Sequence, residues 1–163
     1  MPYESDKLAI LLPDYRRTRI EAYISLQKAD GTFTQQELAI IDTGAGISLI
    51  PKRLWKDKLS LDGEPKGPHD VGGISHKADC RVPTHLARIK GILFDDQLHL
   101  TDLLAFNALL VDDDLEKPLL GIRDMLDQFV LYCDVQNNIA YLEGANIHQI
   151  PEDASSIDSV TED

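Results

Sequence analysis

Hydrophobic and polar residues alternate along much of the chain, the pattern of β-strands with one buried face. The clearest case is residues 19–27, RIEAYISLQ, in which every second residue from Ile20 to Leu26 is apolar. Asp30-Gly31 follows, a pair that readily adopts a hairpin turn, and the next predicted strand covers residues 37–41. Five later segments are also predicted as strands: residues 85–90, 98–100, 106–111, 129–134 and 139–142.

Helix is predicted for only two short segments. The first covers residues 51–59, which begin with a proline and place Leu54, Trp55 and Leu59 among lysines. Trp55 is expected to be a core or interface aromatic. The second covers residues 121–128, with apolar residues at helical spacing: Ile122, Met125, Leu126 and Phe129. The expected fold is therefore mostly β with one or two short helices.

Length and composition indicate one folded domain with short extensions. A chain of 163 residues is large enough to bury a core without disulfides or metal ions. We assign the domain to residues 19–150 and treat residues 1–18 as an N-terminal arm, a possible strand or dimer contact. Residues 151–163 contain five acids and no base, which predicts a disordered acidic tail.

Charge and hydropathy restrict the expected partners and location. The formal charge of −12 disfavours nucleic acid and anionic membranes as main partners, because the surface would repel phosphate. No apolar run approaches the length of a membrane span, and the N-terminus lacks the pattern of a secretory signal. Cys80 and Cys133 form no spaced motif, so we expect a reduced, cytoplasmic protein.

The strongest candidate for chemistry is Asp42. It opens the sequence Asp42-Thr43-Gly44-Ala45 between two apolar segments, Ala-Ile-Ile before it and Ile-Ser-Leu-Ile after Gly46. A tight turn in which Asp and Gly serve only the backbone would explain the tripeptide alone. The apolar flanks favour a carboxylate drawn toward the interior, where it must be paired, hydrogen-bonded or functional.

In this and two further segments, the sequence resembles the retropepsin-like aspartic proteases, the single-lobed relatives of pepsin. The second segment, around Val71, Gly72, Gly73 and Ile74, is similar to the glycine-rich tip of the family's flap. The third, Leu120-Gly121 followed by Arg-Asp-x-Leu, is similar to the family's final helix and hairpin. The resemblance covers about residues 19–143 and implies a closed, barrel-like single lobe that forms a symmetric homodimer.

The resemblance implies an aspartic endopeptidase without metal or organic cofactor. Two carboxylates would share a proton and hold the water that attacks the peptide bond. The chain carries a single Asp-Thr-Gly, so Asp42 from each of two subunits would form the dyad. Thr43 and Gly44 would fix the dyad. Ala45 lacks the hydroxyl that would lower the carboxyl pKa, which implies a mildly acidic or neutral optimum.

The flap segment would close over an extended peptide substrate, although Gly72-Gly73 alone would suggest an ordinary hairpin turn. Ile122 separates Gly121 from Arg123, whereas compact viral members place Arg directly after Gly. The family's dimer-stabilising ion pair is therefore not assigned to Arg123. The acidic residues 112–114 are expected to lie in a solvated loop.

Parts of the sequence also suggest three other functions. His69, His76, Cys80 and His85 lie within 17 residues, but they lack the spacing of a zinc site, so no metal site is predicted. The loop after Asp42 also resembles the phosphate-binding loop of actin-like ATPases, which need a second phosphate loop that this chain lacks. The main alternative is a retropepsin-like dimerisation or peptide-binding module with little or no proteolytic activity. The intact Asp42-Thr43-Gly44 favours the enzyme.

Overall fold

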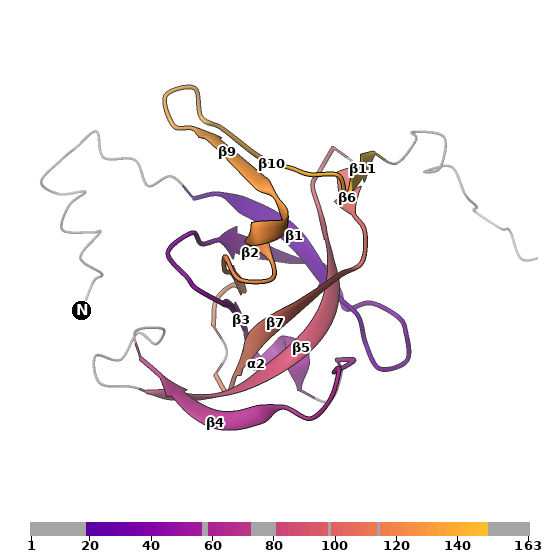
Figure 1. Ribbon diagram of the computed structural model, residues 1–163, viewed down its shortest axis with the longest axis vertical. Coiled ribbons are helices and arrows are strands. Elements are labelled where there is room, and N and C mark those ends of the chain that lie inside the picture. Colours follow the sequence, from indigo (N-terminus) through magenta and orange to yellow (C-terminus); the bar gives the residue numbers. More distant parts are fainter. Residues whose placement is uncertain (1–18, 57–58, 73–80, 98, 114, 150–163) are drawn as a thin grey trace, which may run out of the picture.

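The computed structural model describes residues 19–56, 59–72, 81–97, 99–113 and 115–149 (Figure 1). Of these residues 53% are in strands and 6% in helices, which confirms a mostly β fold. The arm at residues 1–18 and the tail at 151–163 lie outside the described residues. Within the described ranges, no helix has the length and apolar character needed to cross a membrane.

The elements follow one another in this order: β1 (Glu21–Leu26), β2 (Glu37–Ile41), β3 (Ser48–Ile50), α2 (Lys52–Trp55), β4 (Lys66–Val71), β5 (Val82–Phe94), β6 (His99–Thr101), β7 (Leu104–Val111), β8 (Leu119–Leu120), the 3₁₀ helix η1 (Leu126–Gln128), β9 (Val130–Asp134), β10 (Ile139–Glu143) and β11 (Ile147–Gln149).

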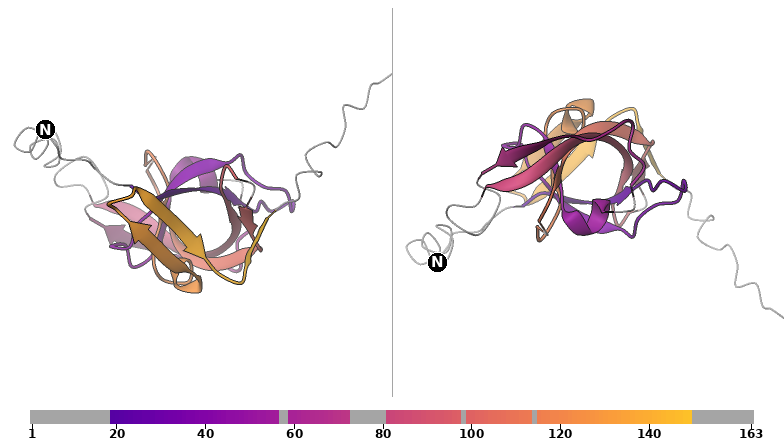
Figure 2. Two further views of the ribbon diagram at one scale, coloured as in Figure 1. Left: turned by 90° about the horizontal axis from the view of Figure 1, so that it is seen from above. Right: turned by 90° about the horizontal axis from the view of Figure 1, so that it is seen from below.

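Six strands close into a barrel in the order β1-β2-β8-β3-β7-β5, and pairing of β5 with β1 completes the ring (Figure 2). The pairs β2–β8 and β3–β7 are parallel, and the remaining pairs of the ring are antiparallel. Closure pairs both edges of each of these strands, so the ring itself has no open sheet edge.

The alternating strand pattern fills the barrel with side chains. Along β7, Leu104, Phe106, Ala108 and Leu110 are each at most 3% exposed, while the residues between them are half-buried. They pack with inward residues of the other strands in a single core cluster. Buried apolar side chains of this kind each contribute about 1.5–3 kcal/mol.

The remaining strands extend the barrel rather than close it. Strand β4 pairs with the first half of β5, and β6 pairs with β5 and β11. The β9–β10 hairpin forms a separate two-stranded sheet. It lies across one end of the barrel, and α2 lies at the other end (Figure 2).

The structure confirms the strands predicted from the sequence. They correspond to β1, β2, β6, β9 and β10, to the central part of β5 and to β7 without its first two residues. The Asp30-Gly31 turn is also present, because residues 27 and 33 form a bridge across it. The first predicted helix is shorter than expected: it covers only Lys52–Trp55, and Leu59 pairs with Lys28 instead.

The prediction of an α-helix over residues 121–128 is wrong. The chain makes turns there and then the single turn of η1. Asp124 has a φ of 62°, in the left-handed region, which interrupts a right-handed helix. Its backbone N–H is bonded to the Asp127 carboxylate, and its own carboxylate accepts a hydrogen bond from Asn107. Ile122, expected on the buried face, is 45% exposed.

Candidate active site

Asp42 lies at the end of β2, where the parallel pairing with β8 continues for one more hydrogen bond. The backbone N–H of Ile40 donates to Pro118, and that of Asp42 donates to Leu120, both at 2.9 Å. On the other side of β2, the N–H of Ile41 donates to the carbonyl of Ile20 at 2.9 Å. The backbone at Asp42 is therefore held by barrel strands, and its side chain is half-buried.

The turn after Asp42 orients its carboxylate. The backbone N–H of Gly44 donates to Oδ1 of Asp42 at 2.9 Å, and the N–H of Ala45 donates to the Asp42 carbonyl at 3.1 Å. A Cβ on Gly44 would lie 3.2 Å from the same Oδ1, so glycine leaves room for the carboxylate there. Thr43 and Gly44 are exposed and Ala45 is half-buried.

Leu120 and Gly121, far away in sequence, close the other side of this turn. A Cβ on Gly121 would lie 2.4 Å from the carbonyl carbon of Ile47, so the two backbones meet at a distance that only glycine permits. The N–H of Gly121 donates to the buried Ser48 hydroxyl at 3.0 Å. The next N–H, that of Ile122, donates to the Ala45 carbonyl at 2.9 Å. The first and third sequence segments therefore interlock around one loop.

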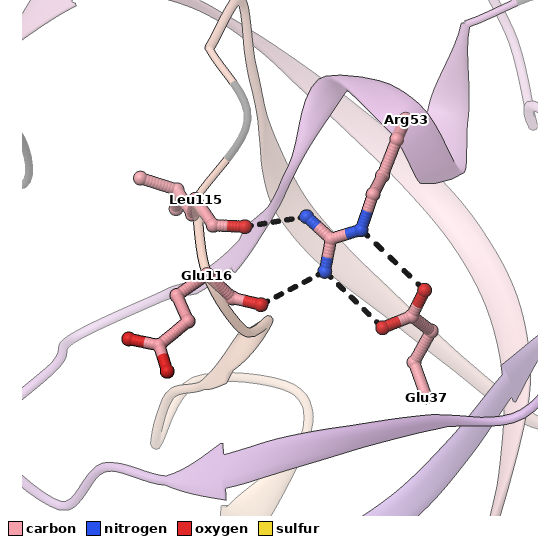
Figure 3. Close-up of polar contacts among 4 residues, drawn as sticks. All are labelled: Glu37, Arg53, Leu115 and Glu116. Atoms are coloured by element: carbon pink, nitrogen blue, oxygen red, sulfur yellow. Dashed lines mark hydrogen bonds and ion pairs between the residues drawn. The ribbon is translucent and has the colours of Figure 1, made fainter.

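Arg53 links the start of β2 to the segment just before β8 (Figure 3). These are the ends of the two strands opposite Asp42 and Gly121. From α2, its guanidinium donates to both carboxylate oxygens of Glu37, at 3.1 and 3.4 Å, where β2 begins. It also donates to the carbonyls of Leu115 and Glu116, shortly before β8. Both ionic side chains are about one-third exposed, at 33% and 30%. Because the β2–β8 ladder spans only two residue pairs, this clamp reinforces a short junction.

A second carboxylate is not supplied by the loop itself, since Asp42 is the only acid in residues 42–47. The acids that follow Gly121 have structural roles: Asp124 binds Asn107, and Asp127 binds the Asp124 N–H at 3.0 Å. Arg123 is exposed, and its backbone N–H donates to Gly46 at 3.1 Å.

The predicted flap is described only in part. Val71 ends β4 and is half-buried, and Gly72 is exposed, whereas Gly73 and Ile74 lie outside the described residues. Strand β4 is otherwise exposed along its length and pairs antiparallel with β5. The described part of this segment is therefore the end of one strand in an antiparallel β4–β5 pair (Figure 1).

Other candidate residues fall outside the site. His69 and His85 lie on β4 and β5, and His76 and Cys80 are not described. No group of three or more potential metal ligands occurs among the described residues. Asp112 and Asp113 are exposed, in agreement with a solvated loop, whereas Asp114 lies outside the described residues. A hydrogen bond from Lys52 lowers the pKa of the Asp112 carboxyl.

A cavity of about 680 Å³ lies beside the site rather than at it. It is formed by the first half of β1, by Leu38 and Ile41 of β2, by the β5–β6 turn with β6, and by β10. Ile41 lines it, but Asp42 does not. The cavity therefore adjoins the strand that carries Asp42 without enclosing the carboxylate.

Comparison with known proteins adds no relative: no protein-family model matches the chain, and no curated protein matches it.

Sequence reasoning did not identify Arg53, Ser48 or Asn107 as parts of this region. Ser48 could have been identified from the sequence, because it is a polar residue inside the apolar run Ile-Ser-Leu-Ile. In the structure Ser48 is fully buried. Arg53 had no such signal, because its partners are 16, 62 and 63 residues away.

Proposed function

We propose that this protein is an aspartic endopeptidase in which Asp42 from each of two subunits forms the catalytic dyad. The observation that carries the proposal is the interlocked loop. The carboxylate of Asp42 is oriented by the Gly44 N–H, and the backbone beneath it is fixed by Leu120 and Gly121. Thr43 and Gly44 remain exposed beside it, where a second copy of the loop can approach.

In the proposed mechanism the dyad holds one proton and one water. Two adjacent carboxylates do not both ionise readily, so one is a carboxylate and the other a carboxylic acid. The carboxylate removes a proton from the water as its oxygen attacks the peptide carbon, and the acid protonates the carbonyl oxygen. The resulting tetrahedral diol then collapses: the protonated dyad carboxyl gives its proton to the amide nitrogen, the C–N bond breaks, and the other dyad carboxylate takes a proton from a diol hydroxyl as the new carboxylic acid forms. No metal or organic cofactor takes part.

The β4–β5 hairpin, including the segment Val71 to Ile74, is proposed to cover an extended peptide and exclude water. Such a peptide would bind by backbone hydrogen bonds as well as by its side chains. We also propose that the protein acts in the cytoplasm. The alternative proposal is a dimerisation or peptide-binding module with little or no activity.

A digest of a peptide library tests the assignment of Asp42. The wild type is expected to produce defined cuts between pH 4 and 8, and Asp42→Asn is expected to lose all of them. Asp62→Asn is a matched control, since Asp62 is an exposed acid whose side chain lies 3.9 Å from Arg88, and it should cut as the wild type does. Retention of the cuts by Asp42→Asn contradicts the assignment, and a wild type without any cuts favours the module.

A further inference from the structure

The β9–β10 hairpin carries the most concentrated apolar surface of the described chain. Its cross-strand pairs place six residues on its outer face in three rows: Asp134 with Ile139, Tyr132 with Tyr141, and Val130 with Glu143. The four apolar members are 45–66% exposed. The two tyrosine rings stack with their centroids 4.9 Å apart.

The orientation of this face is fixed by the opposite face of the hairpin. Leu131 and Leu142, paired across the strands, pack against the barrel core. The hairpin cannot turn its tyrosines inward without exposing these two leucines. Within the described residues the hairpin pairs with no third strand, and a two-stranded sheet alone is only marginally stable. An exposed aromatic face on such an element is typical of an interaction surface.

The pattern of the six residues is nearly symmetric. A half-turn about the centre of the face exchanges Tyr132 with Tyr141, Val130 with Ile139, and Asp134 with Glu143. The apolar residues therefore form one diagonal band, and the acids occupy the two remaining corners. Asn137 holds the pKa of the Asp134 carboxyl below its ordinary value by hydrogen bonding, so that corner stays charged. Self-association along the band buries the tyrosines and leaves the acids at the margin in water.

The hairpin is also continuous with the Asp42 region. Its tip forms a small cavity with Arg19, Ile20 and Glu21, and Ile20 is bonded to the residue before Asp42. At its base, the segment from Gly121 leads through η1 into β9. Contacts through Ile20 and the chain from Gly121 therefore link the hairpin to the Asp42 loop.

We propose that the outer face of the hairpin, formed by Val130, Tyr132, Ile139 and Tyr141, contacts the same face of a second copy of this chain. This inference rests on the proposed function, which requires two copies. The band offers roughly 400 Å² per copy, about half of what a stable interface buries on each partner. The contact therefore supplies part of the interface, and exposed residues of the Asp42 loop supply the rest.

Analytical ultracentrifugation of the full chain over about 1–200 μM tests the contact. Tyr132→Ser and Tyr141→Ser are each expected to weaken the dimer about tenfold or more relative to the wild type. Phe33→Ser is the matched control, because Phe33 is an aromatic residue 38% exposed in the β1–β2 turn, and it should leave the dimer unchanged. Thermal unfolding at low concentration must show that the tyrosine variants remain folded.

A second pair of variants tests whether the two faces meet. Tyr132→Lys and Tyr132→Glu should each be monomeric, and an equal mixture should associate because the opposite charges face one another. Monomers in the mixture, or tyrosine variants that dimerise as the wild type does, overturn the proposal. So does a wild type that is monomeric at every concentration. If the face instead covers the chain's own residues 8–12, the tyrosine substitutions increase proteolysis of that segment without changing sedimentation.

The outcomes separate this inference from the proposed function. Peptide cleavage by a dimer that tolerates both tyrosine substitutions contradicts the hairpin contact and leaves the protease proposal intact. A hairpin-dependent dimer that cleaves no peptide contradicts the protease proposal alone. Asp42→Asn should still dimerise, because asparagine has nearly the same shape and its amide oxygen can accept the Gly44 N–H hydrogen bond that orders the loop.

Discussion

Gly121 and Gly46 belong to the same interlocked loop, yet they meet different surroundings. A Cβ at position 121 would lie within 2.8 Å of three backbone atoms of Ile47, and backbone cannot move aside as a side chain can. A Cβ at position 46 would meet nothing within 4 Å. The close approach of two chain segments, rather than a special turn, is what requires glycine at 121.

We therefore predict that Gly121→Ala lowers the free energy of unfolding by about 3 kcal/mol, as expected when an extra carbon is forced into a packed site. Gly46→Ala should change it by no more than about 1 kcal/mol, and the change is expected to be stabilising if the backbone suits alanine. Urea unfolding of both variants measures the difference. Equal stability of the two variants would show that the loop and Gly121 do not pack as described.

Among the secondary-structure elements, β8 depends most on contacts outside its own ladder. It has two residues, and it joins β2 and β3 through three residue pairs in total. Arg53 adds hydrogen bonds to the carbonyls just before it and to Glu37 at the start of β2. The guanidinium is suited to this role because its planar fork can serve a carboxylate and two carbonyls together.

Arg53→Ala is predicted to destabilise the protein by about 2–3 kcal/mol, because it leaves the half-buried Glu37 carboxylate and two carbonyls without this donor. Arg53→Lys should recover little of the loss, since one ammonium cannot reach all these acceptors. The control is Lys52→Ala on the same helix, whose side-chain pair with Asp112 is more exposed and should cost much less stability than the Arg53 contacts. Chemical unfolding followed by tryptophan fluorescence reports each value. Full recovery by lysine would contradict the clamp.

For the secondary-structure elements, the sequence patterns predicted the strands well and the segments that join them poorly. The alternation that predicted β1 survives in the structure because one face of that strand fills the barrel. The spacing that predicted a helix after Gly121 failed because the left-handed backbone of Asp124 is fixed by Asn107 and Asp127. Strands β8 and β11 have two and three residues, too few to show a period.

For the whole molecule, the sequence indicated that the Asp42 and Gly121 segments lie close together only through its resemblance to the retropepsin-like proteases. The structure brings them together through the parallel pairing of β2 with β8, which are nearly 80 residues apart. The loop carries one half of the proposed dyad. The activity proposed for it must therefore depend on the number of chains as well as on their fold.

This dependence gives a test that needs no knowledge of the interface. Wild-type and Asp42→Asn chains are mixed in equal amounts at a total concentration at which the wild type is dimeric, and peptide cleavage is measured after exchange. If each active site needs Asp42 from both subunits, only wild-type pairs cleave, and these are about one quarter of the dimers. If each chain cleaves alone, half of the activity remains. Asp62→Asn in place of Asp42→Asn should leave activity unchanged, which excludes an effect of mixing. A residual activity near one half would contradict the shared dyad while leaving Asp42 itself as the catalytic acid.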